Sequence, residues 1–130
     1  MYNFRTDLAV ERSNIYRKVN NLENIDGIET EEKEVNDKIK VTRVKITNEN
    51  GEQAIGKPKG VYVTIDLSEL KVAQDEDIDN SAKTLTEELR QIIDNHVGKQ
   101  DDILVVGLGN IYVTPDALGP KVINEIDVTR

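Results

Sequence analysis

A glycine loop followed by an aspartate is the part of this sequence best suited to chemistry. The loop contains Gly107, Gly109 and Asn110, and Asp116 stands six residues after the asparagine. Backbone N–H groups of such a loop can stabilise an oxyanion, and a carboxylate beside them can act as a general base for water or bind a metal ion. An aspartate in the first turn of a helix is also ordinary, because it complements the helix dipole. The spacing alone leaves both interpretations open.

The flanking residues predict the elements that hold this loop. Residues 103–106 (ILVV) form a continuous apolar run, which is typical of a strand buried on both faces of a parallel sheet. Residues 114–116 (TPD) give a helix-start signal, with a hydroxyl, a proline at the first helical position and an acid in the first turn. In open α/β sheets, sites lie at this carboxyl end of the strands. Apolar residues then recur at helical spacing: Leu118, Val122, Ile123 and Ile126.

Other catalytic and binding motifs are weak. A G-x-G-x-x-G dinucleotide fingerprint needs a third glycine, and Tyr112 occupies that position. The chain has no cysteine and one histidine, His96, so it offers neither a thiol nucleophile nor an H-E-x-x-H zinc motif. His96 falls in the last turn of a predicted helix, where a cation complements the dipole. Any hydrolytic chemistry would therefore depend on carboxylates or a metal.

Charge and composition exclude several classes of function. Lys and Arg total 17 against 25 for Asp and Glu, a formal net charge of −8. This balance argues against direct binding to nucleic acid or to an anionic membrane, because no basic patch is evident. No apolar run approaches membrane-spanning length and the N-terminus is not of the secretory type, which favours the cytoplasm. The length of 130 residues fits one domain.

The remaining pattern predicts a mixed α/β chain. Residues 39–46 are typical of a strand with a bulge, and residues 48–51 (NENG) of a hairpin turn. Residues 61–67 alternate as a half-buried strand. The acidic run at 29–38 indicates a solvated helix face or loop, and residues 8–19 a short strand followed by a helix.

The clearest predicted helix covers residues 80–97 and is ended by Gly98. Its apolar stripe consists of Leu85, Leu89, Ile92 and Ile93.

Four segments resemble one known family. VVGLGN at 105–110 followed by VTPDALGPKV at 113–122 is similar to the spore germination proteases, which cleave small acid-soluble spore proteins. RTDLAVE at 5–11, AIGK at 54–57 and GVYVT at 60–64 resemble family segments in the family's order. A more distant similarity links the loop to the hydrogenase maturation proteases, in which the carboxylate at the position of Asp116 is a metal ligand.

The resemblance implies an α/β fold of the three-layer α/β/α type shared with the hydrogenase maturation proteases and phosphorylase-like proteins, with a hairpin-rich N-terminal region. It implies a hydrolase of the spore core cytoplasm, an endopeptidase that forms homotetramers. Asp116 would be catalytic, with Gly107, Gly109 and Asn110 lining the site. No cofactor is implied, although a metal ion at Asp116 stays open.

The resemblance also implies a chain more than twice this long, so these residues would be its amino-terminal part. The resemblance also implies a second catalytic Asp that works with Asp116 and that by position would lie beyond Arg130. This chain alone would then be inactive. Two alternatives stay open: a non-catalytic segment for substrate binding or assembly, and a maturation-type metalloprotease for one partner protein.

The N-terminus resembles a substrate of the same family. The family cuts between an acidic and an apolar residue, and is made as a zymogen that processes itself. Thr6-Asp7 followed by LAVE at 8–11 imitates such a cleavage sequence. The resemblance thus implies a processing bond between Asp7 and Leu8, with a propeptide over residues 1–7 and the N-terminal part of a protease domain over residues 8–130. We expect the segment to be loosely docked.

Overall fold

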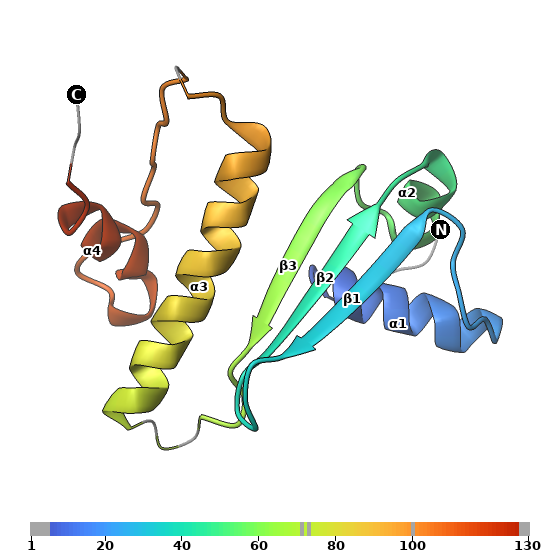
Figure 1. Ribbon diagram of the computed structural model, residues 1–130, viewed down its shortest axis with the longest axis horizontal. Helices are drawn as coiled ribbons and strands as arrows, with labels where there is room; N and C mark the ends of the chain where they lie inside the picture. The colour runs from blue at the N-terminus through green and yellow to red at the C-terminus, as the bar shows by residue number, and fades with distance from the viewer. Residues whose placement is uncertain (1–5, 71, 73, 100, 128–130) are drawn as a thin grey trace. The chain divides into compact units, whose positions relative to one another are not determined.

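A computed structural model describes residues 6–70, 72, 74–99 and 101–127. The chain divides into two compact units, with the boundary between Asn95 and His96. The first unit holds helices α1 (Ala9–Asn20) and α2 (Glu49–Ile55), strands β1 (Ile28–Glu34), β2 (Lys40–Ile46) and β3 (Gly60–Asp66), and helix α3 (Asp75–His96), which ends at the boundary (Figure 1). The second unit holds the 3-10 turn η1 (Thr114–Asp116) and helix α4 (Leu118–Asn124). The fold is therefore mixed α and β, as predicted, while the three-layer arrangement stays a prediction.

The sheet is antiparallel, with strand order β1–β2–β3. The predicted strands β2 and β3 are confirmed. The bulge is wrong, because both pairings run in continuous register, from Ile28 opposite Ile46 to Glu34 opposite Lys40 in the first pair. The acidic run predicted as a loop or helix face is largely edge strand β1. Charged side chains suit an edge strand because they oppose pairing with another chain.

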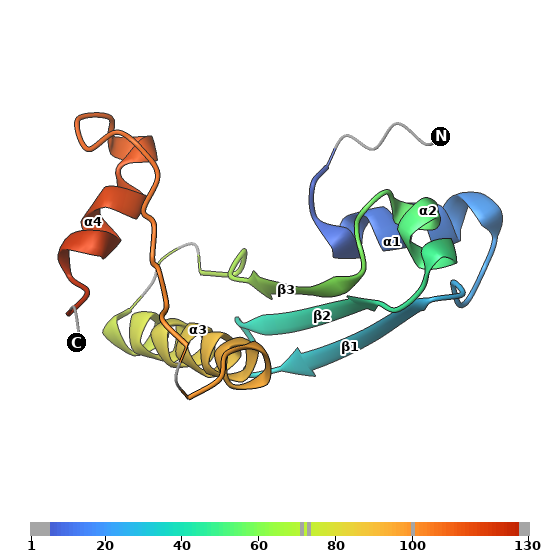
Figure 2. The ribbon, with the colours of Figure 1, turned by 90° about the horizontal axis from the view of Figure 1, so that it is seen from above.

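Helices α1 and α2 pack on the same side of the sheet (Figure 2). The predicted hairpin turn at 48–51 is wrong: these residues begin α2. The Asn48 side chain accepts a hydrogen bond from the Gly51 amide at 3.0 Å, which is the N-cap interaction. A short strand before α1 was also expected, but the helix begins directly at Ala9.

The hydrophobic core lies between these two helices and the sheet. Alternation along β2 sends Val44 and Ile46 to this face and Arg43 to the opposite one. Burial of aliphatic surface is the main stabilising term for such a cluster. Its buried members are Ala9, Ile25, Val44, Ile46, Ala54 and Ile55.

Helix α3 is joined to the sheet by charged side chains. The Glu88 carboxylate accepts two hydrogen bonds from the Arg43 guanidinium, and both side chains are largely buried. The Glu88 bond is the main cause that raises the pKa of Arg43. Lys38 on the β1–β2 turn binds Asp77 with its Nζ at 3.0 Å from both carboxylate oxygens. The helix predicted at residues 80–97 is thus confirmed and starts earlier, at Asp75, while its apolar stripe is exposed: Leu85, Leu89, Ile92 and Ile93.

The strand predicted at residues 103–106 is wrong. These residues have no regular secondary structure, and their side chains are more than half exposed, from 51% at Val105 to 86% at Leu104. A strand exists through hydrogen bonds to a neighbouring strand. In the part of the chain that the structure describes, all the paired strands are β1–β3, and they pair only with one another.

In the same described ranges, no helix is long and apolar enough to cross a membrane.

Candidate functional site

Asp116 closes the glycine loop onto itself. The Asn110 amide donates to the Asp116 carboxylate, with N at 2.9 Å from Oδ2, and to the Asp116 backbone carbonyl at 3.0 Å. The Asn110 side-chain oxygen accepts a hydrogen bond from the Tyr112 amide at 3.0 Å. The Asn110 backbone carbonyl accepts one from the Val113 amide at 3.0 Å. The sequence prediction that Asp116 lies beside a peptide N–H of the loop is confirmed.

Asp116 does not cap the following helix. It is the last residue of η1, and α4 begins at Leu118 without a side-chain cap. The predicted helix start at 114–116 is therefore displaced, and Pro120 gives the physical reason. In one continuous α-helix the residue 120 amide would donate to the Asp116 carbonyl, but proline has no N–H. That carbonyl accepts from Asn110 instead, so the helix cap is not the role of Asp116 in this structure.

The two glycines hold the loop in a conformation that larger residues would disturb. Gly109 has φ of 142°, and a Cβ there would collide with the Asp116 carbonyl oxygen. A Cβ on Gly107 would collide with the Gly119 carbonyl and the Ile123 side chain. Gly109 thus adopts a positive φ, and both glycines bring the loop backbone close to other atoms of the same unit. Their role in lining a catalytic site stays a prediction.

An open hollow of about 720 Å³ lies beside the loop. Asp116 is not part of its lining, and its side chain is exposed to water. The structure therefore brings Gly107, Gly109 and Asn110 together around one hollow, while the carboxylate holds the loop closed and stays accessible to solvent. The other lining residues are Val105, Val106, Ile111, Pro120, Ile123 and Asn124.

Among the residues described, no group of three or more His, Cys, Asp or Glu side chains is arranged to hold a metal ion.

The proposed processing bond lies at the start of α1. Asp7 is 97% exposed, and Leu8 is the extended residue that precedes the helix, with φ −73° and ψ 124°. The expected loose docking concerns the segment before Leu8, of which the structure describes Thr6 and Asp7. The Asp7 side chain is exposed, whereas Arg12 binds the Thr6 carbonyl at 2.7 Å, and Ala9, beyond the bond, is buried. The apolar residues that precede Leu8, which are Met1, Tyr2 and Phe4, lie outside the described residues.

Sequence reasoning missed Arg12. Its guanidinium also binds the Ile55 and Gly56 carbonyls, 43 and 44 positions away along the chain. No local spacing could indicate partners at that separation. The one signal was a basic residue shortly after the proposed cleavage sequence.

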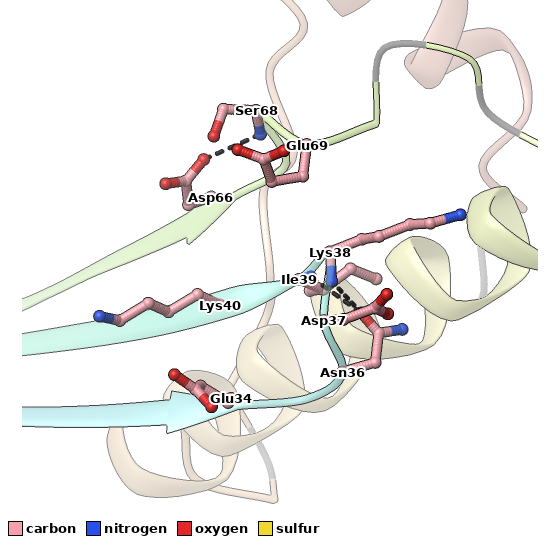
Figure 3. A pocket seen from close by; sticks show the side chains of 9 residues that line it. All are labelled: Glu34, Asn36, Asp37, Lys38, Ile39, Lys40, Asp66, Ser68 and Glu69. Atoms are coloured by element: carbon pink, nitrogen blue, oxygen red, sulfur yellow. Dashed lines mark hydrogen bonds between the residues drawn. The ribbon is translucent and has the colours of Figure 1, made fainter.

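A second hollow, of about 360 Å³, lies at the turn between β1 and β2 (Figure 3). Several of its polar side chains have partners within the fold. Asp66 accepts from the Ser68 amide at 2.9 Å, which is the main cause that lowers the pKa of Asp66. Asn36 accepts from the amides of Lys38 and Ile39, and Lys40 pairs with Glu32 at 2.7 Å. These contacts shape the turn.

Comparison with known proteins identifies close relatives. The sequence profile of the family described as germination protease matches residues 5–130. Germination protease of Clostridium perfringens is 48% identical over 130 residues, which cover all of this chain and 39% of that protein. The protein of the same name from Clostridium acetobutylicum is 42% identical over 132 residues. That of Priestia megaterium is 40% identical over 134 residues, covering 99% of this chain and 36% of that protein. The chain thus spans less than two-fifths of the length of these relatives.

Proposed function

The chain belongs to the germination protease family, and on this basis we propose that it is the amino-terminal part of an endopeptidase that degrades small acid-soluble spore proteins during germination. The observation that carries the proposal is the match along residues 5–130, at 40–48% identity to proteins named germination protease. The protein would act in the cytoplasm of the spore core as a homotetramer, and the three-layer fold would be completed by the rest of the protease.

Asp116 is the proposed catalytic carboxylate. It is exposed to water, and its Oδ2 is fixed by the Asn110 amide at 2.9 Å, so its orientation is set before substrate binds. A positioned carboxylate can remove a proton from an attacking water molecule, or it can contribute one ligand to a metal ion. Gly107 and Gly109 line the adjacent hollow, in which a substrate backbone would bind.

A non-catalytic role is the second candidate, and one observation favours it. The Asp116 carboxylate already has a structural task, since it closes the loop through Asn110. On this alternative the segment binds substrate or supports assembly, and the chemistry is performed elsewhere in the protease.

The test replaces Asp116 with Asn in a full-length family protein that carries these residues. The Asn side-chain oxygen can still accept from the Asn110 amide, so the loop should be retained while the negative charge is lost. If Asp116 is the base or a metal ligand, turnover of an acid-soluble spore protein should fall by about 10²-fold or more. Asp102→Asn is the matched control, because Asp102 is an exposed acid in the same unit.

Product termini determined by sequencing would establish where the substrate is cut. Cleavage of the spore protein between an acidic and an apolar residue supports the proposed specificity. A folded Asp116→Asn protein with near wild-type turnover would eliminate the catalytic role and leave the loop-closing role alone.

Self-processing between Asp7 and Leu8 belongs to the same proposal. The acid before the bond is what the active site would recognise, so Asp7→Lys should block maturation of the full-length zymogen. A mature protein that begins at Leu8 supports this bond, whereas normal maturation of the Lys variant contradicts it.

A further inference from the structure

Arg12 binds both residues that precede the Asp7–Leu8 bond. Its Nε donates to the Thr6 carbonyl at 2.7 Å, and its Nη2 lies 3.2 Å from the Asp7 carboxylate. The Arg12 side chain is only 15% exposed, whereas Asp7 is 97% exposed. Solvent screens the ion pair with Asp7, so the bond to the Thr6 carbonyl contributes more to holding the segment.

The same guanidinium is fixed to helix α2. Its Nη1 lies 3.1 Å from the Ile55 carbonyl and 3.0 Å from the Gly56 carbonyl. The last carbonyls of a helix have no partner within the helix, and a cation there is favoured by the helix dipole. Gly56 ends α2 in the left-handed conformation, with φ of 65°, which leaves its carbonyl and that of Ile55 available to one donor. Arg12 is therefore an anchored group rather than a loose surface side chain.

The residues after the bond are held as well. Leu8 precedes α1, and its carbonyl accepts from the Arg12 amide at 3.0 Å, the first hydrogen bond of the helix. Ala9 is 3% exposed and belongs to the hydrophobic core. Proteases bind the residues around a cleaved bond as an extended strand, through main-chain hydrogen bonds. This segment has to leave Arg12 and unwind the first turn of α1 before it can bind in that form.

We propose that Arg12 is a latch that keeps the Asp7–Leu8 bond from a protease active site until the latch opens. An active site specific for an acid before the cleaved bond would bind the Thr6 carbonyl and the Asp7 carboxylate. Arg12 already binds both of these groups. The inference rests on the proposed function in taking Asp7–Leu8 as the processing bond. Hydrolysis would add one water molecule, leaving a carboxylate on Asp7 and an amine on Leu8.

The latch can be tested without the family's own activity. The chain is exposed to limiting amounts of an endopeptidase that cuts after acidic residues, and cleavage between Asp7 and Leu8 is followed by mass and terminal sequencing. When opening is fast relative to cleavage, the rate tracks the population of the open form. Loss of hydrogen bonds from a charged group should raise that population, so Arg12→Gln should be cut at this bond about tenfold faster than the unaltered chain.

Arg17→Gln is the matched control. Arg17 lies on the same helix, and its guanidinium binds Asn14 at 2.8 Å. The Arg17→Gln substitution should leave the rate of cleavage between Asp7 and Leu8 unchanged. Arg12→Lys serves if Arg12→Gln folds poorly, since the lysine keeps the charge but cannot reach all of the acceptors together, and it too should accelerate cleavage. Circular dichroism verifies the fold of each variant. An Arg12 variant that is folded but cut no faster than the Arg17 control overturns the proposal.

The same substitutions in a full-length family protein separate the latch from the proposed function. If the latch and self-processing are both correct, Arg12→Gln matures about tenfold faster than the unaltered zymogen. If the external protease cuts the Arg12 variants faster but neither zymogen cuts itself after Asp7, the latch stands and the processing bond is wrong. If external cleavage is unchanged, the latch is wrong whether or not the zymogen matures.

Discussion

Substitution of Glu88 should destabilise the first unit more than substitution of most other charged residues, because its carboxylate is buried. Its carboxylate is 5% exposed and receives both the Nε and an Nη of Arg43. The third interaction of Arg43 is with Glu31, which is 69% exposed, at 3.1 Å. Glu88→Gln keeps the volume, removes the charge and turns an N–H donor towards one of the guanidinium donors.

The expected loss follows from the burial of the pair. Removing one partner of a buried ion pair typically costs about 3–5 kcal/mol, because the other charge is left without compensation. Glu31 remains as an exposed partner of Arg43, and Gln keeps one hydrogen-bond acceptor. We therefore expect Glu88→Gln to lower the free energy of unfolding by roughly 2–3 kcal/mol. Glu87→Gln is the matched control. Glu87 is the adjacent residue, 61% exposed, and pairs with Lys33 at 3.8 Å, so its loss should be below about 1 kcal/mol.

Urea unfolding followed by circular dichroism measures both variants, with equal slopes required for the comparison. A double-mutant cycle with Arg43→Met isolates the interaction, and a coupling energy of about 1–3 kcal/mol is expected for two residues in direct contact. If Glu88→Gln costs no more than Glu87→Gln, the buried pair does not hold α3 to the sheet, and burial of the two charges contributes nothing to the stability of this unit.

Two further predictions concern acid and the loop. The pKa of Asp77 is lowered, mainly by the hydrogen bond from the Gln74 amide and then by Lys38. The ionised Asp77 carboxylate therefore stabilises the fold above the ordinary pKa of 3.8, and this stabilisation is lost as the pH falls through the lower pKa of the folded state. Asp77→Asn should flatten the fall in stability of the first unit below pH 3.8, and an unchanged acid titration by circular dichroism would contradict this. Gly109→Val should displace the Asn110 amide from Asp116 and shift the NMR resonance of that amide, whereas Leu108→Ala, at a residue 83% exposed, should leave the resonance in place. In a full-length family protein the Gly109→Val variant should lose more activity than stability. Equal losses would make Gly109 purely structural.

Local signals in the sequence were sufficient for several elements of the fold and of the candidate site. Alternating apolar residues were sufficient for β2 and β3, and helical periodicity was sufficient for α3. The conformation of Gly109 was also predictable, because only glycine adopts its φ of 142° at low cost. The proximity of Asp116 to the loop followed from the short connection between them. The four family segments were recognisable for the same reason, since each is contiguous.

Partners far along the chain determined the features that the sequence could not predict. The acidic residues of β1 form a strand because β2 pairs with them, and the apolar residues 103–106 do not, because no described strand lies beside them. Asp116 was moved out of the α4 start by the missing amide of Pro120. Arg12 and Arg43 acquired their roles from acceptors 43–45 positions away. Hydrogen bonds and ion pairs act over a few ångströms in space, so the sequence places such groups in contact only once the chain between them has folded.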